Sequence, residues 1–160
     1  MLIMKTTFML ASALRQFVAC PGNKCISLST PELRFFVIDH LYNQLGEEKI
    51  SRLVAAFYSQ VKTDDLLGPM YPPDDWEGSE KRLRDFLIYR LGGPDTYLRE
   101  RGHPRLRARH MPFQIGLAER DRWLDMMGRA MREADISPEI APVLGAFFAQ
   151  LADFMRNKEG

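Results

Sequence analysis

Apolar residues recur every three or four positions along much of this chain, and that spacing decides its fold class. The clearest stretch is residues 50–61, where Ile50, Leu53, Val54, Phe57, Tyr58 and Val61 fall on one face of a helix. No segment alternates apolar and polar residues for long enough to indicate a strand. The sequence therefore predicts an all-α domain.

Other segments carry the same helical spacing. Apolar residues over 83–91 share one face, and the following run Gly92–Pro94 predicts the end of that helix. Ser137 followed by Pro138 predicts the start of a C-terminal helix, with the serine as its N-cap. Shorter stretches predict helices over 35–45 (ending near Gly46), 106–110 and 117–131.

The bulk properties set limits on the function. The 160 residues suit one domain, and we expect residues 38–157 to form it, with residues 1–37 as a loosely ordered extension. A formal net charge of +1 gives the chain no overall preference for nucleic acid or an acidic membrane. Its apolar stretches are too short to span a membrane or to direct export, so we expect a cytoplasmic protein.

Among the three histidines, His110 is placed differently from the other two. His40 and His103 lie where surface or capping roles are typical. His110 follows Leu106 at helical spacing and ends a basic helix just before Pro112, so its ring can face inward. Taken alone, this position still favours a buried, hydrogen-bonded histidine over a ligand.

A longer pattern surrounds His110. The run GHPRLRARHMPF over 102–113, with ERDRWL over 119–124, resembles the haem-binding stretch of the group II truncated haemoglobins. The segments that agree in the same order are LY with Gly46 over 41–46, FYSQV over 57–61, YPPDD over 71–75, RLR over 82–84 and GGPDTY over 92–97. The resemblance extends from about Asp39 to near Phe154. It departs at Glu47, where the family usually has a second glycine, so we expect that corner to be built differently.

The resemblance implies a truncated globin fold, a two-on-two helical sandwich around haem b. His110 matches the proximal iron ligand. Tyr58 and Trp123 match the distal hydrogen-bond donors, Ser79 matches the usual distal histidine position, and Tyr71 matches a further distal aromatic. Without the resemblance, Tyr58 and Trp123 would be interpreted as ordinary core aromatics.

Further residues are expected to contact the haem. Leu83 and Phe86 match residues of its distal wall, and Phe57, in the matching segment 57–61, is also expected to contact the haem. The two propionates need cations or hydroxyls, for which the candidates are Arg82, Arg109 and Tyr97. The only cysteines are Cys20 and Cys25, and the chain has no C-x-x-C-H run, so the haem would be held without thioether bonds.

Several functions stay open at this level. A five-coordinate haem iron could bind oxygen, NO or CO, or act as an NO dioxygenase or on peroxide with a reductase partner, as monomer or homodimer. The alternative class is a nucleic-acid or protein-binding module that uses the basic residues between Arg99 and Arg109. A helical scaffold without haem is a third interpretation, which the combination of His110, Tyr58 and Trp123 disfavours.

Overall fold

The computed structural model describes residue 38 and residues 40–159, and the predicted extension over 1–37 therefore lies outside the described residues. Helices are the only regular elements in this part of the chain, as the apolar spacing predicts. They are α2 (Leu41–Val61), the 3₁₀ helix η1 (Gly68–Met70), α3 (Trp76–Arg90), α4 (Thr96–Arg101), α5 (Leu106–His110), α6 (Leu117–Glu133) and α7 (Ala141–Met155). None of these helices is long and apolar enough to cross a membrane.

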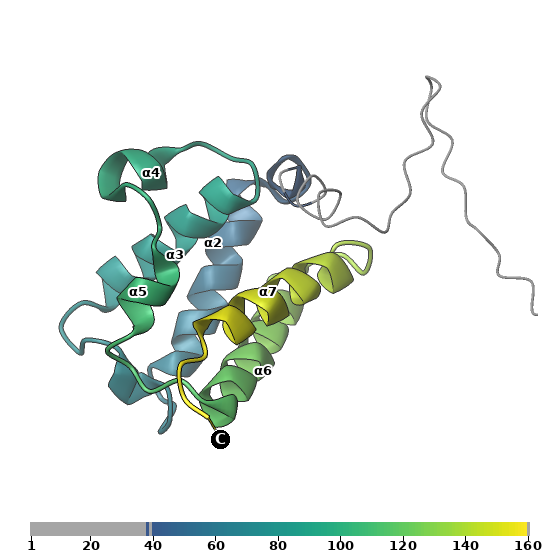
Figure 1. Cartoon of the computed structure of the whole chain (residues 1–160). Coiled ribbons are helices and arrows are strands. Elements are labelled where there is room, and N and C mark those ends of the chain that lie inside the picture. The colour runs from purple at the N-terminus through teal and green to yellow at the C-terminus, as the bar shows by residue number, and fades with distance from the viewer. Residues whose placement is uncertain (1–37, 39, 160) are drawn as a thin grey trace, which may run out of the picture.

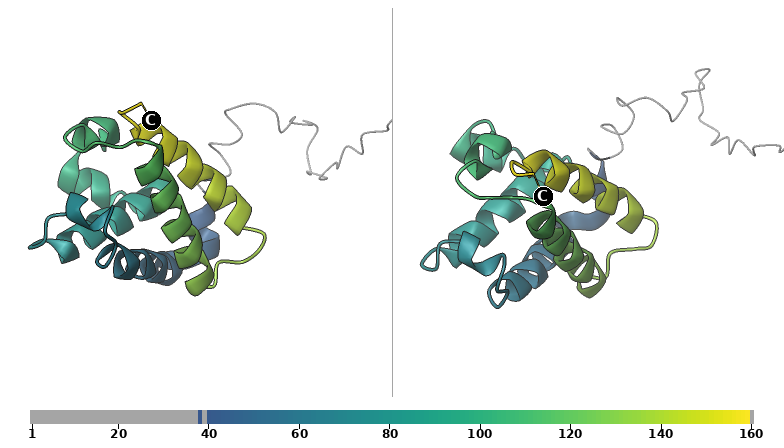
Figure 2. Two further views of the ribbon diagram at one scale, coloured as in Figure 1. Left: turned by 90° about the horizontal axis from the view of Figure 1, so that it is seen from below. Right: turned by 60° about the horizontal axis from the view of Figure 1, so that its bottom comes forward.

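The four long helices form two pairs that pack on each other. Helix α2 contacts both α3 and α6, and α6 contacts α7, so α2 and α6 join the pair α2/α3 to the pair α6/α7 (Figure 1). The short helices α4 and α5 lie to one side, where α4 contacts α3 and α5 contacts α7 (Figure 2). This arrangement confirms the predicted two-on-two sandwich.

The core forms where the apolar faces of α2 and α6 meet their neighbours. Ile50, Leu53 and Val54 of α2 are completely buried, as are Met127 of α6 and Leu144 of α7. Complete burial of an aliphatic side chain of this size contributes about 1.5–3 kcal/mol. The face predicted from the spacing over 50–61 is thus the face that holds the two helix pairs together.

Helix α2 is interrupted at Gly46, where the backbone takes φ 72° and ψ 165°. Glycine adopts this region readily, whereas side chains with a Cβ do not. Glu47 is helical, so Gly46 alone makes the corner that was expected at this position. The kink lets residues 41–45 lie against the end of α3, where the Tyr42 amide donates to the Leu91 carbonyl (2.9 Å).

The start of α7 differs from the sequence prediction. Ser137 was expected to cap a helix beginning at Pro138, but α7 begins at Ala141, with Ile140 as N-cap and no side-chain cap. Pro142 lies in the first turn and has no amide hydrogen, so it cannot make the bond to the Pro138 carbonyl that a regular helix starting at Pro138 requires. Residues 137–140 form a turn, in which the Ser137 carbonyl accepts from the Ile140 and Ala141 amides.

Gly46→Ala should lower the free energy of unfolding by about 1–3 kcal/mol, because alanine at this φ is strained although open space surrounds the position. Urea denaturation followed by circular dichroism measures the effect. Gly145→Ala, within α7, is the matched control. Its new Cβ meets only Met131 Cε at 3.9 Å, and it should stabilise the chain by about 0.5–1 kcal/mol. Equal effects of the two substitutions would contradict the assigned backbone strain.

Candidate functional site

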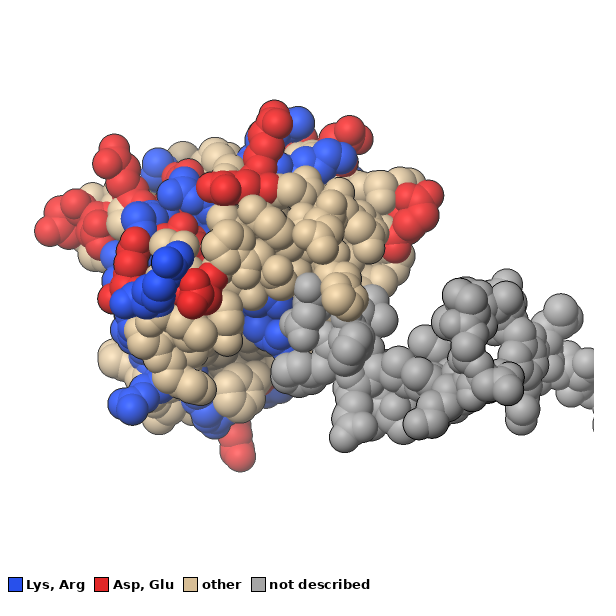
Figure 3. All heavy atoms as spheres, turned by 90° about the horizontal axis from the view of Figure 1, so that it is seen from above, with Lys and Arg blue, Asp and Glu red and all other residues tan. Residues whose placement is uncertain are grey.

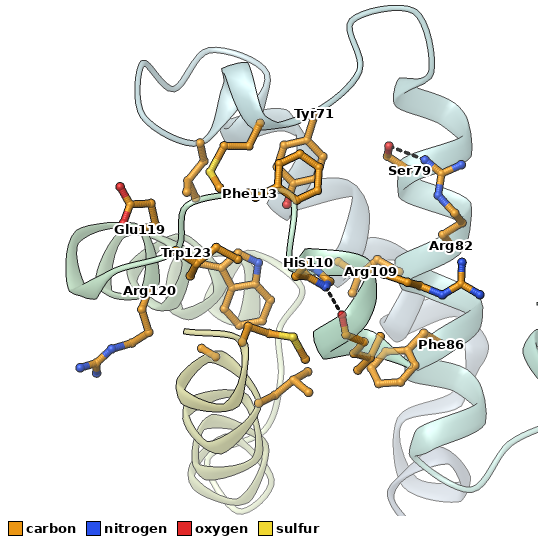
Figure 4. A pocket seen from close by; sticks show the side chains of 18 of the residues that line it. Tyr71, Ser79, Arg82, Phe86, Arg109, His110, Phe113, Glu119, Arg120 and Trp123 are labelled. Atoms are coloured by element: carbon orange, nitrogen blue, oxygen red, sulfur yellow. Dashed lines mark hydrogen bonds between the residues drawn. The ribbon is translucent and has the colours of Figure 1, made fainter. Parts of the chain in front are cut away.

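A cavity of about 610 Å³ opens between α3, α5, α6 and α7 (Figure 4). Tyr58 of α2, Tyr97 and Arg101 of α4 and the segment 67–72 complete its wall. It brings together all but one of the site residues that the sequence predicts, namely Tyr58, Tyr71, Ser79, Arg82, Leu83, Phe86, Tyr97, Arg109, His110 and Trp123. Predicted site residues from five helices and from the segment 67–72 therefore face one space.

Phe57 is the exception, because it does not line the cavity. Its ring is completely buried behind the wall. It packs edge-on against Tyr58 (ring centroids 5.4 Å apart) and tilted against Trp123 (5.5 Å). Successive residues of a helix point in different directions, so Phe57 and Tyr58 cannot share one face. Phe57 thus holds the two neighbouring rings in place.

His110 is the last residue of α5, and its side chain lies on the cavity wall. Its Nδ1 lies 2.7 Å from the Leu106 carbonyl oxygen, one turn earlier in the same helix (Figure 4). A carbonyl oxygen can only accept, so Nδ1 is the donor and carries the hydrogen. In the neutral imidazole the lone pair then lies on Nε2, the nitrogen that Leu106 does not engage.

Tyr58 extends from α2 to the cavity wall and is buried. Its hydroxyl donates a hydrogen bond to the Ser79 carbonyl of α3 (2.9 Å). Burial raises the pKa of Tyr58 well above its ordinary value, and the neighbouring Tyr71 adds to the rise. The phenol is therefore neutral, with its single hydrogen directed at α3.

Tyr71 and Trp123 form a second polar pair. The Tyr71 ring packs edge-on against Tyr58, with centroids 5.6 Å apart. Burial raises the pKa of Tyr71 to about 12, and the neighbouring Trp123 side chain acts in the opposite direction. Both side chains line the cavity, so the indole N–H and the phenol O–H can both serve a ligand there.

The predicted cations at the mouth already have partners within the chain. Arg82 donates to Asp75 Oδ2 (2.7 Å) and to Ser79 Oγ (2.8 Å). Arg109 donates to the carbonyls of Pro104 (2.8 Å) and Arg101 (3.4 Å). Figure 4 shows both guanidinium groups on the same side of the cavity. Carboxylates entering there would meet two neighbouring positive charges.

Three of the basic residues between Arg99 and Arg109, namely Arg99, Arg107 and Arg109, make contacts within the chain. Arg99 pairs with Asp95 (3.0 Å), and Arg107 donates to the Phe154 carbonyl (2.8 Å). The face in Figure 3 shows basic and acidic side chains interspersed around an uncharged centre. A surface that binds nucleic acid would concentrate one sign of charge.

Several residues of the cavity wall were not predicted from the sequence. The end of α7 contributes Leu151, Ala152 and Met155, and the segment after α5 contributes Phe113 and Ile115. The apolar spacing of α7 marks those three residues as inward-facing, but spacing cannot separate a cavity wall from ordinary core.

The chain belongs to the bacterial-like globins, whose family model matches residues 40–157. It is similar to the group 2 truncated haemoglobin YjbI of Bacillus subtilis, with 44% identity over 117 residues that cover 73% of this chain and 88% of the relative. Two-on-two hemoglobin-3 of Arabidopsis thaliana is 30% identical and covers 75% of this chain and 71% of its own length.

Solved structures agree with this assignment. The haemoglobin of Chloroflexus aurantiacus superimposes with a TM-score of 0.72 at 41% identity, covering 74% of this chain and 98% of its own. The group II truncated haemoglobin of Bacillus anthracis gives a TM-score of 0.71 at 36% identity, covering 74% and 97%. The globin fold argues against the alternative of a helical module that binds nucleic acid or protein. Membership of the globin family implies a haem cofactor.

The cavity residues fit such a cofactor. Its wall is largely apolar, with Leu67, Leu83 and Phe86 among its members, and two of its arginines, Arg82 and Arg109, lie near one edge. In the described residues, no three His, Cys, Asp or Glu side chains gather as a metal site. A single histidine suits an iron whose other ligands come from a porphyrin.

Replacing Tyr71 by phenylalanine should flatten the pH dependence of stability at alkaline pH. The pKa of Tyr71 is about 12 in the folded chain and close to 10 when unfolded. The neutral phenol therefore makes its full contribution to the stability of the folded chain below pH 10. This contribution is lost as the pH rises towards 12. Urea denaturation between pH 9 and 11.5 should show a slope up to about 1 kcal/mol per pH unit shallower in Tyr71→Phe. Identical slopes would contradict the burial of this phenol.

Proposed function

We propose that the chain binds haem b through His110 and uses the iron to bind oxygen or another small ligand such as NO, CO or peroxide. The observation that carries this proposal is the His110 ring, whose Nδ1 is held by the Leu106 carbonyl while the ring lies on the wall of a cavity. An Nδ1 hydrogen bond to a backbone carbonyl orients an imidazole and raises its basicity as a metal ligand. Nε2 is thereby prepared to bind iron.

The haem is held without covalent attachment, since the sequence has no C-x-x-C-H run. Leu83 and Phe86 provide apolar contacts to its faces. Arg109 and Tyr97 receive the propionates, and Arg82 joins them by leaving Asp75. That exchange is inexpensive, because the Arg82 and Asp75 side chains are 34% and 47% exposed, and an exposed ion pair contributes only about 0–1 kcal/mol.

When bound, the haem supplies an open iron position for a small ligand. Tyr71 and Trp123 line the cavity and offer the ligand an O–H and an N–H donor. Tyr58 becomes a donor to the ligand only after it releases the Ser79 carbonyl. The buried Ser79 takes the place of a distal histidine, so its short side chain leaves room in the cavity.

Strong hydrogen-bond donors in an enclosed cavity slow ligand release, which suits redox chemistry or sensing better than oxygen delivery. We propose NO dioxygenation or peroxide reduction, with a reductase as electron donor, as the redox functions to test first. We also assign residues 38–157 to the globin domain, with residues 1–37 as an extension, and place the protein in the cytoplasm as a monomer or homodimer.

The full chain supplemented with haem should give a strong Soret band, and His110→Ala should weaken haem affinity. Loss of an outer-shell partner typically reduces metal affinity about 10–100-fold, and loss of the ligand should reduce it at least as much. Spectroscopic titration with haem measures both. His103→Ala is the control, because this exposed histidine only accepts from the Arg105 amide. No haem uptake by the unsubstituted chain would refute the proposal.

Tyr71→Phe should speed oxygen dissociation about tenfold, since one hydrogen bond to a partly charged acceptor contributes about 1.5 kcal/mol. Trp123→Phe should act in the same direction, because it removes the indole N–H donor from the cavity wall. Tyr58→Phe should have the smallest effect. Stopped-flow measurements compare the three variants with Tyr89→Phe, which removes a hydroxyl outside the cavity wall. A larger effect from Tyr58→Phe would reverse the assigned order of donors.

A further inference from the structure

The residues that follow α7 are hydrogen-bonded to the segment that carries His110. The Asn157 side chain makes three of these bonds. Its Nδ2 donates to the His110 carbonyl (3.2 Å) and to the Phe113 carbonyl (2.8 Å). Its Oδ1 accepts from the Ile115 amide (3.0 Å). One side chain thus reaches both ends of the loop between α5 and α6.

Backbone bonds reinforce this attachment. The Asn157 and Lys158 amides both donate to the Ile115 carbonyl, at 3.0 and 3.2 Å. Ile115 is itself buried and lies on the cavity wall. Residues 157–158, the tail that follows α7, therefore donate hydrogen bonds to the loop between α5 and α6 and accept one from it, next to the cavity.

The segment needs this support because α5 is only five residues long. A helix of one turn is unstable without tertiary contacts, and its last carbonyls have no partner within the helix. His110 is the final residue, so its carbonyl is one of these groups. The Phe113 amide provides one donor to it (3.0 Å), and Asn157 provides the second.

We propose that Asn157 is a positioning residue for His110. It fixes the peptide from which the ring extends, while the Leu106 carbonyl fixes the rotation of the ring itself. This inference rests on the proposed role of His110 as iron ligand. Asparagine suits the position because aspartate lacks the two donors and alanine lacks all three contacts.

Two substitutions separate these contacts. Asn157→Ala removes all three side-chain bonds, whereas Asn157→Asp keeps an acceptor for the Ile115 amide and loses both donors to the carbonyls. Lys158→Ala is the matched control, because it removes only the exposed bond from Lys158 Nζ to Gln114 Oε1 (2.9 Å) on the same tail. Urea denaturation of each variant reports its global stability separately.

The readouts are the iron–histidine stretching band of the ferrous protein and the rate of ferric haem loss to a haem-scavenging apoprotein. Both Asn157 variants should shift or broaden the band and lose haem about tenfold faster, the effect of one to two lost hydrogen bonds. Lys158→Ala should match the unsubstituted chain. The band reports the iron–nitrogen bond, so a purely structural role for Asn157 would leave it unchanged.

The inference is overturned if both Asn157 variants keep the original band and rate of haem loss, even when their stability falls. It is also overturned if Lys158→Ala produces the same changes, since the tail would then act without the asparagine contacts. Absence of haem uptake by the unsubstituted chain would instead contradict the proposed function, and this inference with it.

Discussion

The hydrogen bond between His110 Nδ1 and the Leu106 carbonyl is the interaction on which the site depends. At 2.7 Å, it fixes which ring nitrogen carries the hydrogen, how the ring is turned and which nitrogen is available to a metal. Both partners belong to a helix of five residues, so this bond survives only where the surrounding structure holds that helix. The packing of α5 against the end of α7 is therefore a requirement of the chemistry.

The fold meets this requirement with few elements. Helices α2 and α6 bury a continuous apolar core, which provides most of the stabilising free energy. The cavity lies beside that core, where α5, the segment 67–72 with its 3₁₀ helix and the irregular segment 111–116 replace a further packed helix. Aromatic rings link the two regions, because Phe57 and Phe148 are core residues that also contact Trp123 on the cavity wall. Haem binding and core packing are consequently coupled.

Much of this could be predicted from the sequence, for physical reasons that differ between elements. The long helices bury one face each, so their apolar spacing revealed them, whereas the six-residue α4 is too short to show a period. The predicted start of α7 at Pro138 was wrong, because the capping preference of Ser137 did not compensate for the missing amide hydrogen of Pro142. His110, Tyr58 and Trp123 were found through the family resemblance, since local pattern alone favoured core roles. Asn157 gave no signal, because its partners lie 42–47 residues earlier in the chain.

The central claim is that a nitrogen of His110 binds the haem iron, and isotope labelling tests it most directly. Resonance Raman spectra of the ferrous protein should be recorded after growth with natural and with ¹⁵N-labelled histidine. Ligation by His110 predicts an iron–nitrogen stretching band that moves to lower frequency on labelling and is absent from His110→Ala. A band that does not respond to the label, or that persists unchanged in His110→Ala, would contradict the account.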